Sequence, residues 1–198
     1  MRVPESKYHE YHDLLEKVHS QIMSIKIDMN DATLRKKWGR AIAAYDCLDD
    51  AIDAILEFDT LEDNAYKTRR PILYYYGILQ AFSIQIDALK QLYQFFYGNK
   101  NVKLEKNKIN IAEIRNDIVH SCSNKGKESC FIAKCNNMPI DSLNYGVYKE
   151  DKSFAEKKID LRDICYTQVQ SICDILNRLS AIPNDQIYFY RELLSKKS

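Results

Sequence analysis

The stretch RPILYYYGILQAFSIQIDALKQLYQFFY, residues 70–97, decides the fold of this chain. Apolar side chains recur in it every three or four residues, which places them on one face of an α-helix. This stripe consists of Tyr75, Tyr76, Leu79, Phe82, Ile86, Leu89, Tyr93 and Phe96. Pro71 is tolerated in a first helical turn, and Gly98 is typical of the residue that ends a helix. We therefore expect residues 70–97 to form the core helix of the protein.

Other parts of the chain repeat the helical spacing. Apolar residues recur every three or four positions in residues 5–26, 31–58, 109–121 and 154–180. Asp31 is a natural N-cap for the second of these helices. Pro183 ends the last one, and a short final helix is expected to start at Asn184 or Asp185. The sequence therefore predicts an all-α fold, an up-and-down helical bundle that forms one domain over residues 1–198.

Residues 121–153 depart from this pattern. They contain Gly126, Pro139 and Gly146, and two short runs, 129–133 and 144–148, have the composition of β-strands. We expect this segment to be a small insertion, a loop or a β-hairpin, that follows the helix at 109–121.

The composition limits the class of protein. With 198 residues, 5 Gly and 4 Pro, the chain can bury a large core but lacks the turns of an all-β sandwich. A net charge of +1 produces no global field that would attract nucleic acid, so such binding would need local basic patches. The N-terminal residues lack the apolar region of a signal peptide, and no apolar stretch is long enough to span a membrane. The 6 cysteines are then expected to be reduced thiols in the cytoplasm.

Polar residues interrupt the core helix at Gln80, Gln85 and Asp87. A buried carboxylate beside an arginine is what a site needs where a guanidinium must be held in place. Asp87 could serve this purpose, or it could lie on the exposed side of the helix. The sequence alone leaves both alternatives open.

Arg115, Asn116 and His120 form the candidate catalytic group, in the stretch IRNDIVH at 114–120. A neutral imidazole transfers protons near pH 7, and a guanidinium binds phosphate through a planar fork of donors. On an ideal helix Arg115 lies about 140° around the axis from His120, on the shoulder of the apolar stripe. The geometry favours a groove or a dimer interface over an isolated pocket.

Arg115-Asn116-x-x-x-His120 resembles the Arg-x4–6-His motif of the HEPN superfamily, including the polar residue after the arginine. The preceding helix also resembles a HEPN-type core helix, at residues 76–81 and 85–88. The order of core helix, basic loop, motif helix and long final helix matches as well, so the similarity covers roughly residues 70–180. Where several relatives have proline after the histidine, this chain has Ser121, which affects the loop that would shape the groove.

The resemblance implies a metal-independent endoribonuclease, in a toxin or antiphage defence role, whose two motifs face each other in a homodimer. His120 would be the general base or acid for attack of a 2′-hydroxyl on the adjacent phosphate, which leaves a 2′,3′-cyclic phosphate. Arg115 would neutralise the charge that builds on the phosphoryl oxygens, and Asn116 would position the pair. Asp87 and Asp117 are expected to support this site.

RNA is the expected substrate, and an antitoxin or another partner protein is a further expected partner. Because the net charge is small, contacts to RNA would come from basic residues that flank the motif. These are Lys103, Lys106, Lys108, Lys125 and Lys127. Two other basic groups have a weaker claim to such contacts, namely Arg35, Lys36, Lys37 and Arg40, and Lys67, Arg69 and Arg70.

Two other interpretations remain open. Some members of the superfamily bind nucleotides or partner proteins without catalysis, and this chain could be such a module. Four zinc ligands are also conceivable, namely His120, Cys122, Cys130 and Cys135. Their spacing contains no Cys-x2–4-Cys pair, and the acidic ridge at Asp46, Asp49, Asp50 and Asp53 has no partner motif for two metals. We therefore expect no metal and no cofactor.

Overall fold

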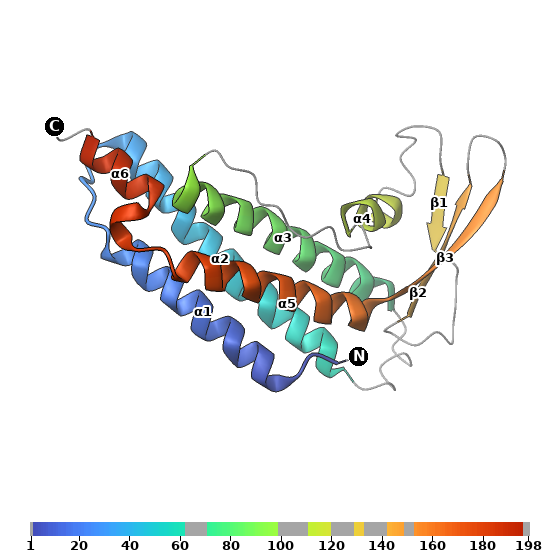
Figure 1. Ribbon diagram of the computed structural model, residues 1–198. Helices are drawn as coiled ribbons and strands as arrows, with labels where there is room; N and C mark the ends of the chain where they lie inside the picture. Colours follow the sequence, from blue (N-terminus) through green and yellow to red (C-terminus); the bar gives the residue numbers. More distant parts are fainter. Residues whose placement is uncertain are drawn as a thin grey trace.

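Over the residues that it describes, the computed structural model is mostly helical, with four long helices and a small sheet beyond one end of them (Figure 1). The described residues are 2–61, 71–98, 111–119, 129–132, 142–148 and 153–195. The long helices are α1 (Glu5–Ser24), α2 (Ala32–Thr60), α3 (Pro71–Tyr97) and α5 (Leu161–Ser180). The shorter α4 (Ile111–Val119) lies beside α3 near the sheet, and α6 (Tyr188–Ser195) follows a 3-10 turn at Asn184–Gln186. The mostly helical architecture predicted from the sequence is confirmed.

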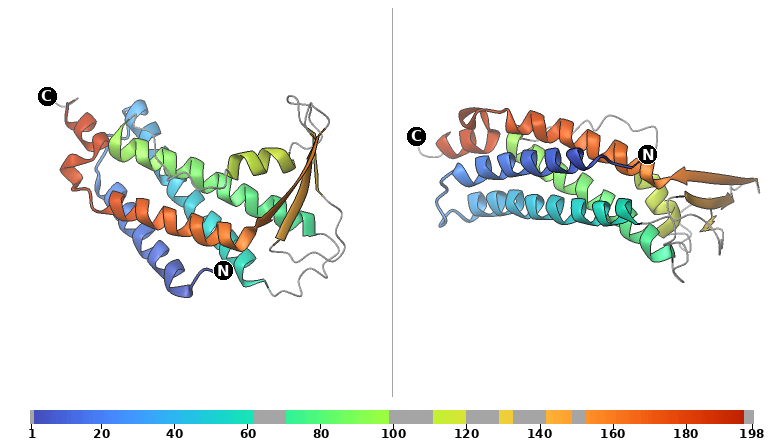
Figure 2. Two further views of the ribbon diagram at one scale, coloured as in Figure 1. Left: turned by 45° about the vertical axis from the view of Figure 1, so that its right-hand side comes forward. Right: turned by 90° about the horizontal axis from the view of Figure 1, so that it is seen from below.

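The long helices α1, α2 and α3 alternate in direction. α5 runs parallel to α1, as the colours in Figure 2 show. At their C-terminal ends, the Gln21 side chain of α1 donates to the carbonyls of Ser180 at 3.2 Å and Ile182 at 2.8 Å. α5 therefore also runs in the same direction as α3, with α4 and the sheet between them along the chain. The reason is that α4 and the sheet return the chain to the end of the bundle where α3 begins.

The sheet has three antiparallel strands in the order β1 (Ser129–Ile132), β2 (Ser142–Tyr148) and β3 (Phe154–Asp160). β1 and β2 lie where the sequence predicts strand-like runs. The helix predicted from residue 154 is wrong over 154–160, and the β-structure extends past the expected insertion of 121–153. The end of the sheet is thus continuous with the start of α5.

Two features explain the error at β3. Its sequence, FAEKKID, is rich in charged residues that favour helices, but every one of its residues pairs with β2. Ile159 lies opposite Leu143 and is buried with it. The helix starts only at Leu161, because the Asp160 side chain accepts a hydrogen bond from the backbone N–H of Asp163 at 3.0 Å.

The buried apolar side chains of the described residues form one cluster, to which the helices α1 to α6 and the sheet all contribute. Of the predicted α3 stripe, Tyr75, Leu79, Phe82, Leu89 and Phe96 are buried, Ile86 and Tyr93 are partly buried, and Tyr76 is exposed. Gln85 is fully buried among them, and its Nε2 donates to the Tyr11 hydroxyl at 3.4 Å. No described helix combines the length and the apolarity that crossing a membrane requires.

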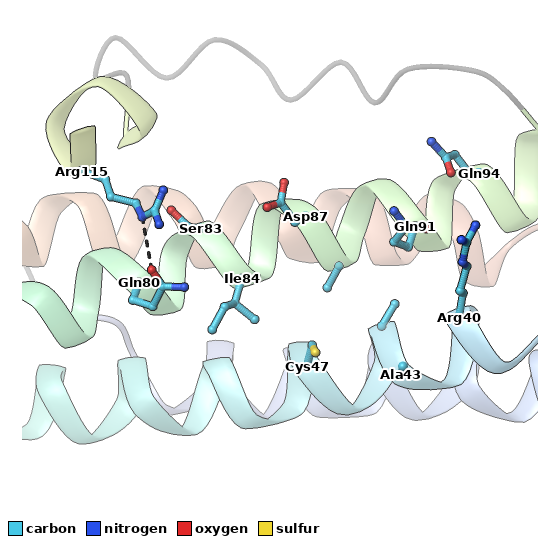
Figure 3. A pocket seen from close by; sticks show the side chains of 12 residues that line it. Arg40, Ala43, Cys47, Gln80, Ser83, Ile84, Asp87, Gln91, Gln94 and Arg115 are labelled. Atoms are coloured by element: carbon cyan, nitrogen blue, oxygen red, sulfur yellow. Dashed lines mark hydrogen bonds between the residues drawn. The ribbon is translucent and has the colours of Figure 1, made fainter. Parts of the chain in front are cut away.

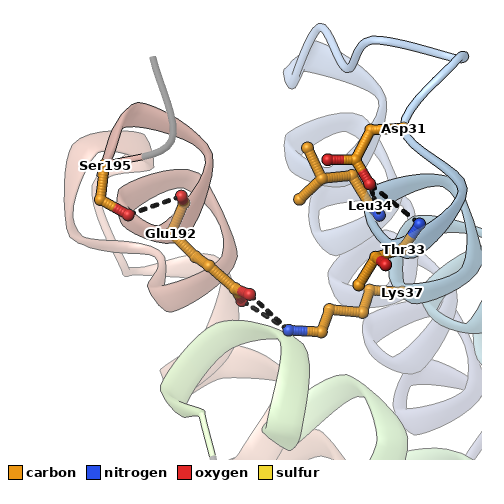
Figure 4. A network of polar contacts seen from close by, with 6 residues as sticks. All are labelled: Asp31, Thr33, Leu34, Lys37, Glu192 and Ser195. Atoms are coloured by element: carbon orange, nitrogen blue, oxygen red, sulfur yellow. Dashed lines mark hydrogen bonds and ion pairs between the residues drawn. The ribbon is translucent and has the colours of Figure 1, made fainter. Parts of the chain in front are cut away.

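The start of α2 is fixed by two polar interactions (Figure 4). Asp31 caps the helix as predicted, since its carboxylate accepts from the backbone N–H groups of Thr33 at 2.9 Å and Leu34 at 3.0 Å. One turn later, the Lys37 ammonium pairs with the Glu192 carboxylate of α6 at 2.5 Å. This ion pair attaches the last helix to the bundle.

A buried polar cluster fixes the other end of α2. The Arg162 guanidinium of α5 donates to the carbonyls of Asp59 at 3.1 Å and Leu61 at 3.0 Å. The Asp59 carboxylate accepts from the backbone N–H of Val3 at 2.9 Å and from the Tyr8 hydroxyl at 3.4 Å. The cluster therefore joins the N-terminal segment, the end of α2 and the start of α5.

Candidate functional site

α4 places Arg115 at the surface of the bundle. Ile111, Ile114 and Ile118 are buried, as their helical spacing predicts, and they hold α4 on the core. Arg115 is partly buried and Asn116 is exposed, so the polar side of the motif points away from the core. The expected orientation of the motif helix is confirmed for these residues.

A glutamine orients the Arg115 side chain. Its Nε donates to the Gln80 Oε1 of α3 at 3.2 Å (Figure 3). Arg115 makes no ion pair with any described residue, and its two Nη nitrogens have no hydrogen-bond partner in that part of the chain. A neutral amide thus holds the guanidinium through one nitrogen and leaves its positive charge uncompensated, which suits the binding of an anion.

Arg115 lies at one end of a groove between α2 and α3, and Arg40 of α2 lies at the other end (Figure 3). The groove has a volume of about 570 Å³. Its lining is mostly neutral and polar or small, and it comprises Arg40, Ala43, Ala44, Cys47, Gln80, Ser83, Ile84, Asp87, Ala88, Gln91, Gln94 and Arg115. Sequence reasoning did not find this groove, because it depends on how α2 and α3 pack.

Asp87 lies on the exposed side of α3, which is the second of the two alternatives. Its side chain is 76% exposed and pairs with Lys90 of the same helix at 2.9 Å. It lines the groove but makes no contact with Arg115, whose partner on α3 is Gln80, two turns earlier. Of the two alternatives for Asp87 the structure thus favours the exposed one, and the side chain of α3 that contacts Arg115 is the amide of Gln80.

Several predicted site residues lie outside the described residues. His120 follows Val119, the last residue of α4, and is one of them. The same holds for the lysines of the expected RNA contacts, Lys103, Lys106, Lys108, Lys125 and Lys127, and for Cys122 and Cys135. The side chains of Asp117 and Cys130 are also not described. The roles proposed for all of these residues stay predictions.

β3 lies beside the polar side of the motif helix. The Lys157 Nζ of β3 pairs with the Glu113 carboxylate of α4 at 3.1 Å and lies 5.4 Å from the centre of the Tyr145 ring. Glu113 and Asn116 are one turn apart on α4, so Lys157 is a basic residue next to the motif. The sequence analysis missed it, because residue 157 was assigned to a helix.

The histidines of α1 form a separate group on the face shared with α2. His12 lies 3.4 Å from the Asp49 carboxylate, and His19 stacks on the Tyr45 ring at 4.1 Å between centroids. The Tyr45 hydroxyl donates to Glu16 at 2.6 Å, and this hydrogen bond raises the pKa of Tyr45. Within the described ranges, no three His, Cys, Asp or Glu side chains are arranged to hold a metal ion.

Comparison of the chain with protein-family models, with curated proteins and with solved structures finds no match.

Proposed function

We propose that the protein is a metal-independent endoribonuclease of HEPN type, with Arg115 and His120 as its catalytic residues. The observation that carries the proposal is the state of Arg115, whose guanidinium is oriented by Gln80 and has no carboxylate partner among the described residues. The buried Arg162 differs from it, because the Arg162 guanidinium donates to the carbonyls of Asp59 and Leu61. Arg115 instead presents its free Nη nitrogens to the groove.

The chemistry requires one phosphate between the two catalytic side chains. The Nη nitrogens of Arg115 bind the non-bridging oxygens and stabilise the negative charge that grows in the transition state. His120 takes the proton from the 2′-hydroxyl as this oxygen attacks the phosphorus. The bond from phosphorus to the 5′-oxygen breaks, the leaving oxygen takes up a proton from solvent, and His120 later returns its proton to solvent. The products are a 2′,3′-cyclic phosphate and a 5′-hydroxyl, and no water is consumed in this step.

A homodimer is part of the proposal. Exposed apolar side chains lie on the N-terminal half of α3, the half that carries Gln80, and they include Leu73 at 58% and Ile84 at 36% exposure. Leu73 and Ile84 lie seven and four residues from Gln80, so the three side chains share one face of α3. An exposed apolar patch beside polar groups is typical of a protein interface. A second copy seated at the Leu73 end of this face would bring a second Arg115 close to the first and leave the groove beyond Gln80 open.

The test is cleavage of RNA in the presence of EDTA. The wild-type protein is expected to cut, and Arg115→Ala and His120→Ala are each expected to abolish cleavage while thermal melting stays unchanged. Arg178→Ala on α5 is the matched control, because Arg178 is an exposed arginine far from the motif. Cleavage that survives in the His120→Ala protein would refute the assignment.

Mixing the two inactive variants tests whether the site is composite. If Arg115 of one subunit works with His120 of the other, half of the randomly formed dimers contain one intact pair, and roughly a quarter of the activity returns. If both residues act within one subunit, no mixture regains activity. A protein that is monomeric at all working concentrations would also contradict the composite site.

The alternative function is a non-catalytic HEPN module that binds a nucleotide or a partner protein. The groove of about 570 Å³ has the size of a small-ligand site, which favours this alternative to some extent. It predicts a stable complex with a nucleotide or a partner chain and no cleavage of any RNA. The EDTA assay and a binding assay with mononucleotides distinguish the two functions.

A further inference from the structure

The groove between α2 and α3 is longer than one nucleotide requires. Arg115 contacts Gln80 at one end of the groove, and Arg40 lies with Gln91 and Gln94 at the other end (Figure 3). Gln80 and Gln94 are fourteen residues apart on α3, which corresponds to about 21 Å along the helix. At the stacked spacing of about 3.4 Å per nucleotide, this distance is close to six nucleotides, and fewer if the strand is extended.

Arg40, like Arg115, has a guanidinium without an anionic partner among the described residues. It is exposed, and it makes no hydrogen bond or ion pair with any described residue. A second hollow of about 260 Å³ adjoins the first, and the two share Arg40, Gln91 and Gln94. Lys37 also lines this hollow, but Glu192 pairs with its ammonium. Among the described residues that line the two hollows, Arg40 and Arg115 are the cations without an anionic partner.

We propose that this groove binds a single strand of RNA, with Arg40 holding a phosphate about four to six nucleotides away from the phosphate at Arg115. The inference rests on the proposed ribonuclease function, and it assigns Arg40 as a substrate-binding residue. Packed helices have axes about 8–10 Å apart, so the groove between α2 and α3 admits one strand and excludes a duplex. The amides of Gln91 and Gln94 can donate to and accept from exposed base edges.

Asp87 sets a constraint on the path of the strand. Its carboxylate lies on the groove between the two arginines and is 76% exposed beside Lys90. This negative charge repels a phosphate, so the strand contacts the middle of the groove with its bases and the two ends with its phosphates. It follows that neutralising Asp87 and neutralising Arg40 change RNA affinity in opposite directions.

The reactivity of Cys47 reports directly whether RNA occupies the groove. It is an exposed free thiol on α2, and it lines the groove between Arg40 and Arg115 (Figure 3). A strand bound along the groove covers this thiol, and alkylation of Cys47 by iodoacetamide should slow at least tenfold when a single-stranded dodecamer RNA saturates the protein. A duplex of the same sequence should not protect it. The experiment uses the full chain with His120→Ala, so that the RNA stays intact.

Three further variants in this background complete the test. Arg40→Gln should weaken dodecamer binding by roughly five- to tenfold and reduce the slope of log affinity against log salt by about 0.7, the value for one phosphate contact on a single strand. Arg35→Gln removes the same charge from α2 outside the groove and is the matched control. Asp87→Asn should tighten binding. Equal effects of Arg40→Gln and Arg35→Gln, or an Asp87→Asn protein that binds more weakly, would overturn the proposal.

The outcomes separate this inference from the proposed function. If the wild-type protein cleaves RNA in EDTA but bound RNA leaves Cys47 as reactive as before, the groove is not the path of the strand and the nuclease assignment stands. If the dodecamer protects Cys47 but no RNA is cleaved, the nuclease assignment fails and the groove remains an RNA site. If a partner protein protects Cys47, RNA does not protect it and no RNA is cleaved, both proposals are refuted in favour of an interaction module.

Discussion

Arg115 on the motif helix α4 and Gln80 on the core helix α3 are joined by a hydrogen bond of 3.2 Å from Nε to Oε1. The bond fixes the plane of the guanidinium and leaves its outer edge free. In this account Gln80 is a positioning residue, because it acts on the substrate only through Arg115. Its amide has an advantage over a carboxylate, since it orients the arginine without neutralising it.

Substitutions of Gln80 should separate orientation from charge. Gln80→Ala frees the guanidinium to rotate, and we expect kcat to fall by roughly tenfold while KM changes less. Gln80→Glu restores the acceptor but forms an ion pair with Arg115, which competes with the phosphate and raises KM. The measurement is steady-state cleavage of a short RNA in EDTA. Gln170→Ala, an exposed glutamine of α5 with a local partner, is the control. Identical kinetics of all three variants and the wild type would exclude the positioning role.

The polar cluster at the end of α2 should carry a measurable part of the stability. Arg162→Ala leaves the carbonyls of Asp59 and Leu61 without their buried donor, and we expect a loss of about 2–4 kcal/mol in the free energy of unfolding. Urea titration followed by circular dichroism measures the change. Arg178→Ala on the exposed side of α5 should cost less than about 0.5 kcal/mol. An equal effect of the two substitutions would contradict the assigned role of the cluster.

Two glycines, Gly98 and Gly39, should respond oppositely to substitution by alanine. Gly98 ends α3 with a φ of +80°, and an added Cβ would lie 3.0 Å from the Tyr188 ring. Gly98→Ala should therefore destabilise the protein by about 1–3 kcal/mol. Gly39 lies within α2 with open space around its Cα, so Gly39→Ala should stabilise by about 0.5–1 kcal/mol. Thermal melting of both variants checks the signs.

The buried thiol of Cys173 should make stability fall at alkaline pH. Burial raises the pKa of this thiol from 9.0 to about 12. The unfolded chain loses the thiol proton near its ordinary pKa, whereas the folded chain keeps it until about pH 12. The contribution of this thiol to the free energy of unfolding is therefore fully present below pH 9. Above pH 9 it falls by about 1.4 kcal/mol per pH unit. The midpoints of urea unfolding at pH 8 and pH 9.5 should differ less in Cys173→Ala than in the wild type. If the difference is the same in both proteins, ionisation of Cys173 is not the cause of the loss of stability.

Much of the helical fold could be predicted from the sequence, because the apolar spacing of α1, α2 and α3 reports directly which face is buried. Asp31 and Gly98 also have the side chain or the conformation that their positions require. β3 could not be predicted, since its Lys and Glu residues have helical propensities and only pairing with β2 makes them a strand. The direction of α5 could not be predicted either, because it depends on how the sheet connects α4 to α5.

The candidate site was predictable in part. The type and spacing of Arg115, Asn116 and His120 suggested the chemistry, and the periodicity of the three isoleucines oriented α4 correctly. Gln80 was missed as a site residue, and Arg40 was only one member of a less favoured basic group, because their roles depend on which helices adjoin Arg115 and not on any local pattern. For Gln80 a weak signal existed, namely a polar residue one turn before Ser83 on a largely apolar helix, but it did not distinguish Gln80 from the buried Gln85.

The central claim is cleavage by Arg115 and His120 without a metal, and the chemistry of the RNA ends tests it most directly. Mass spectrometry of the products formed in EDTA should show 2′,3′-cyclic phosphates and 5′-hydroxyls with the wild-type protein, and intact RNA with Arg115→Ala or His120→Ala. Products with 3′-hydroxyl and 5′-phosphate ends that disappear in EDTA, or cyclic phosphates that persist with the His120→Ala protein, would contradict the account.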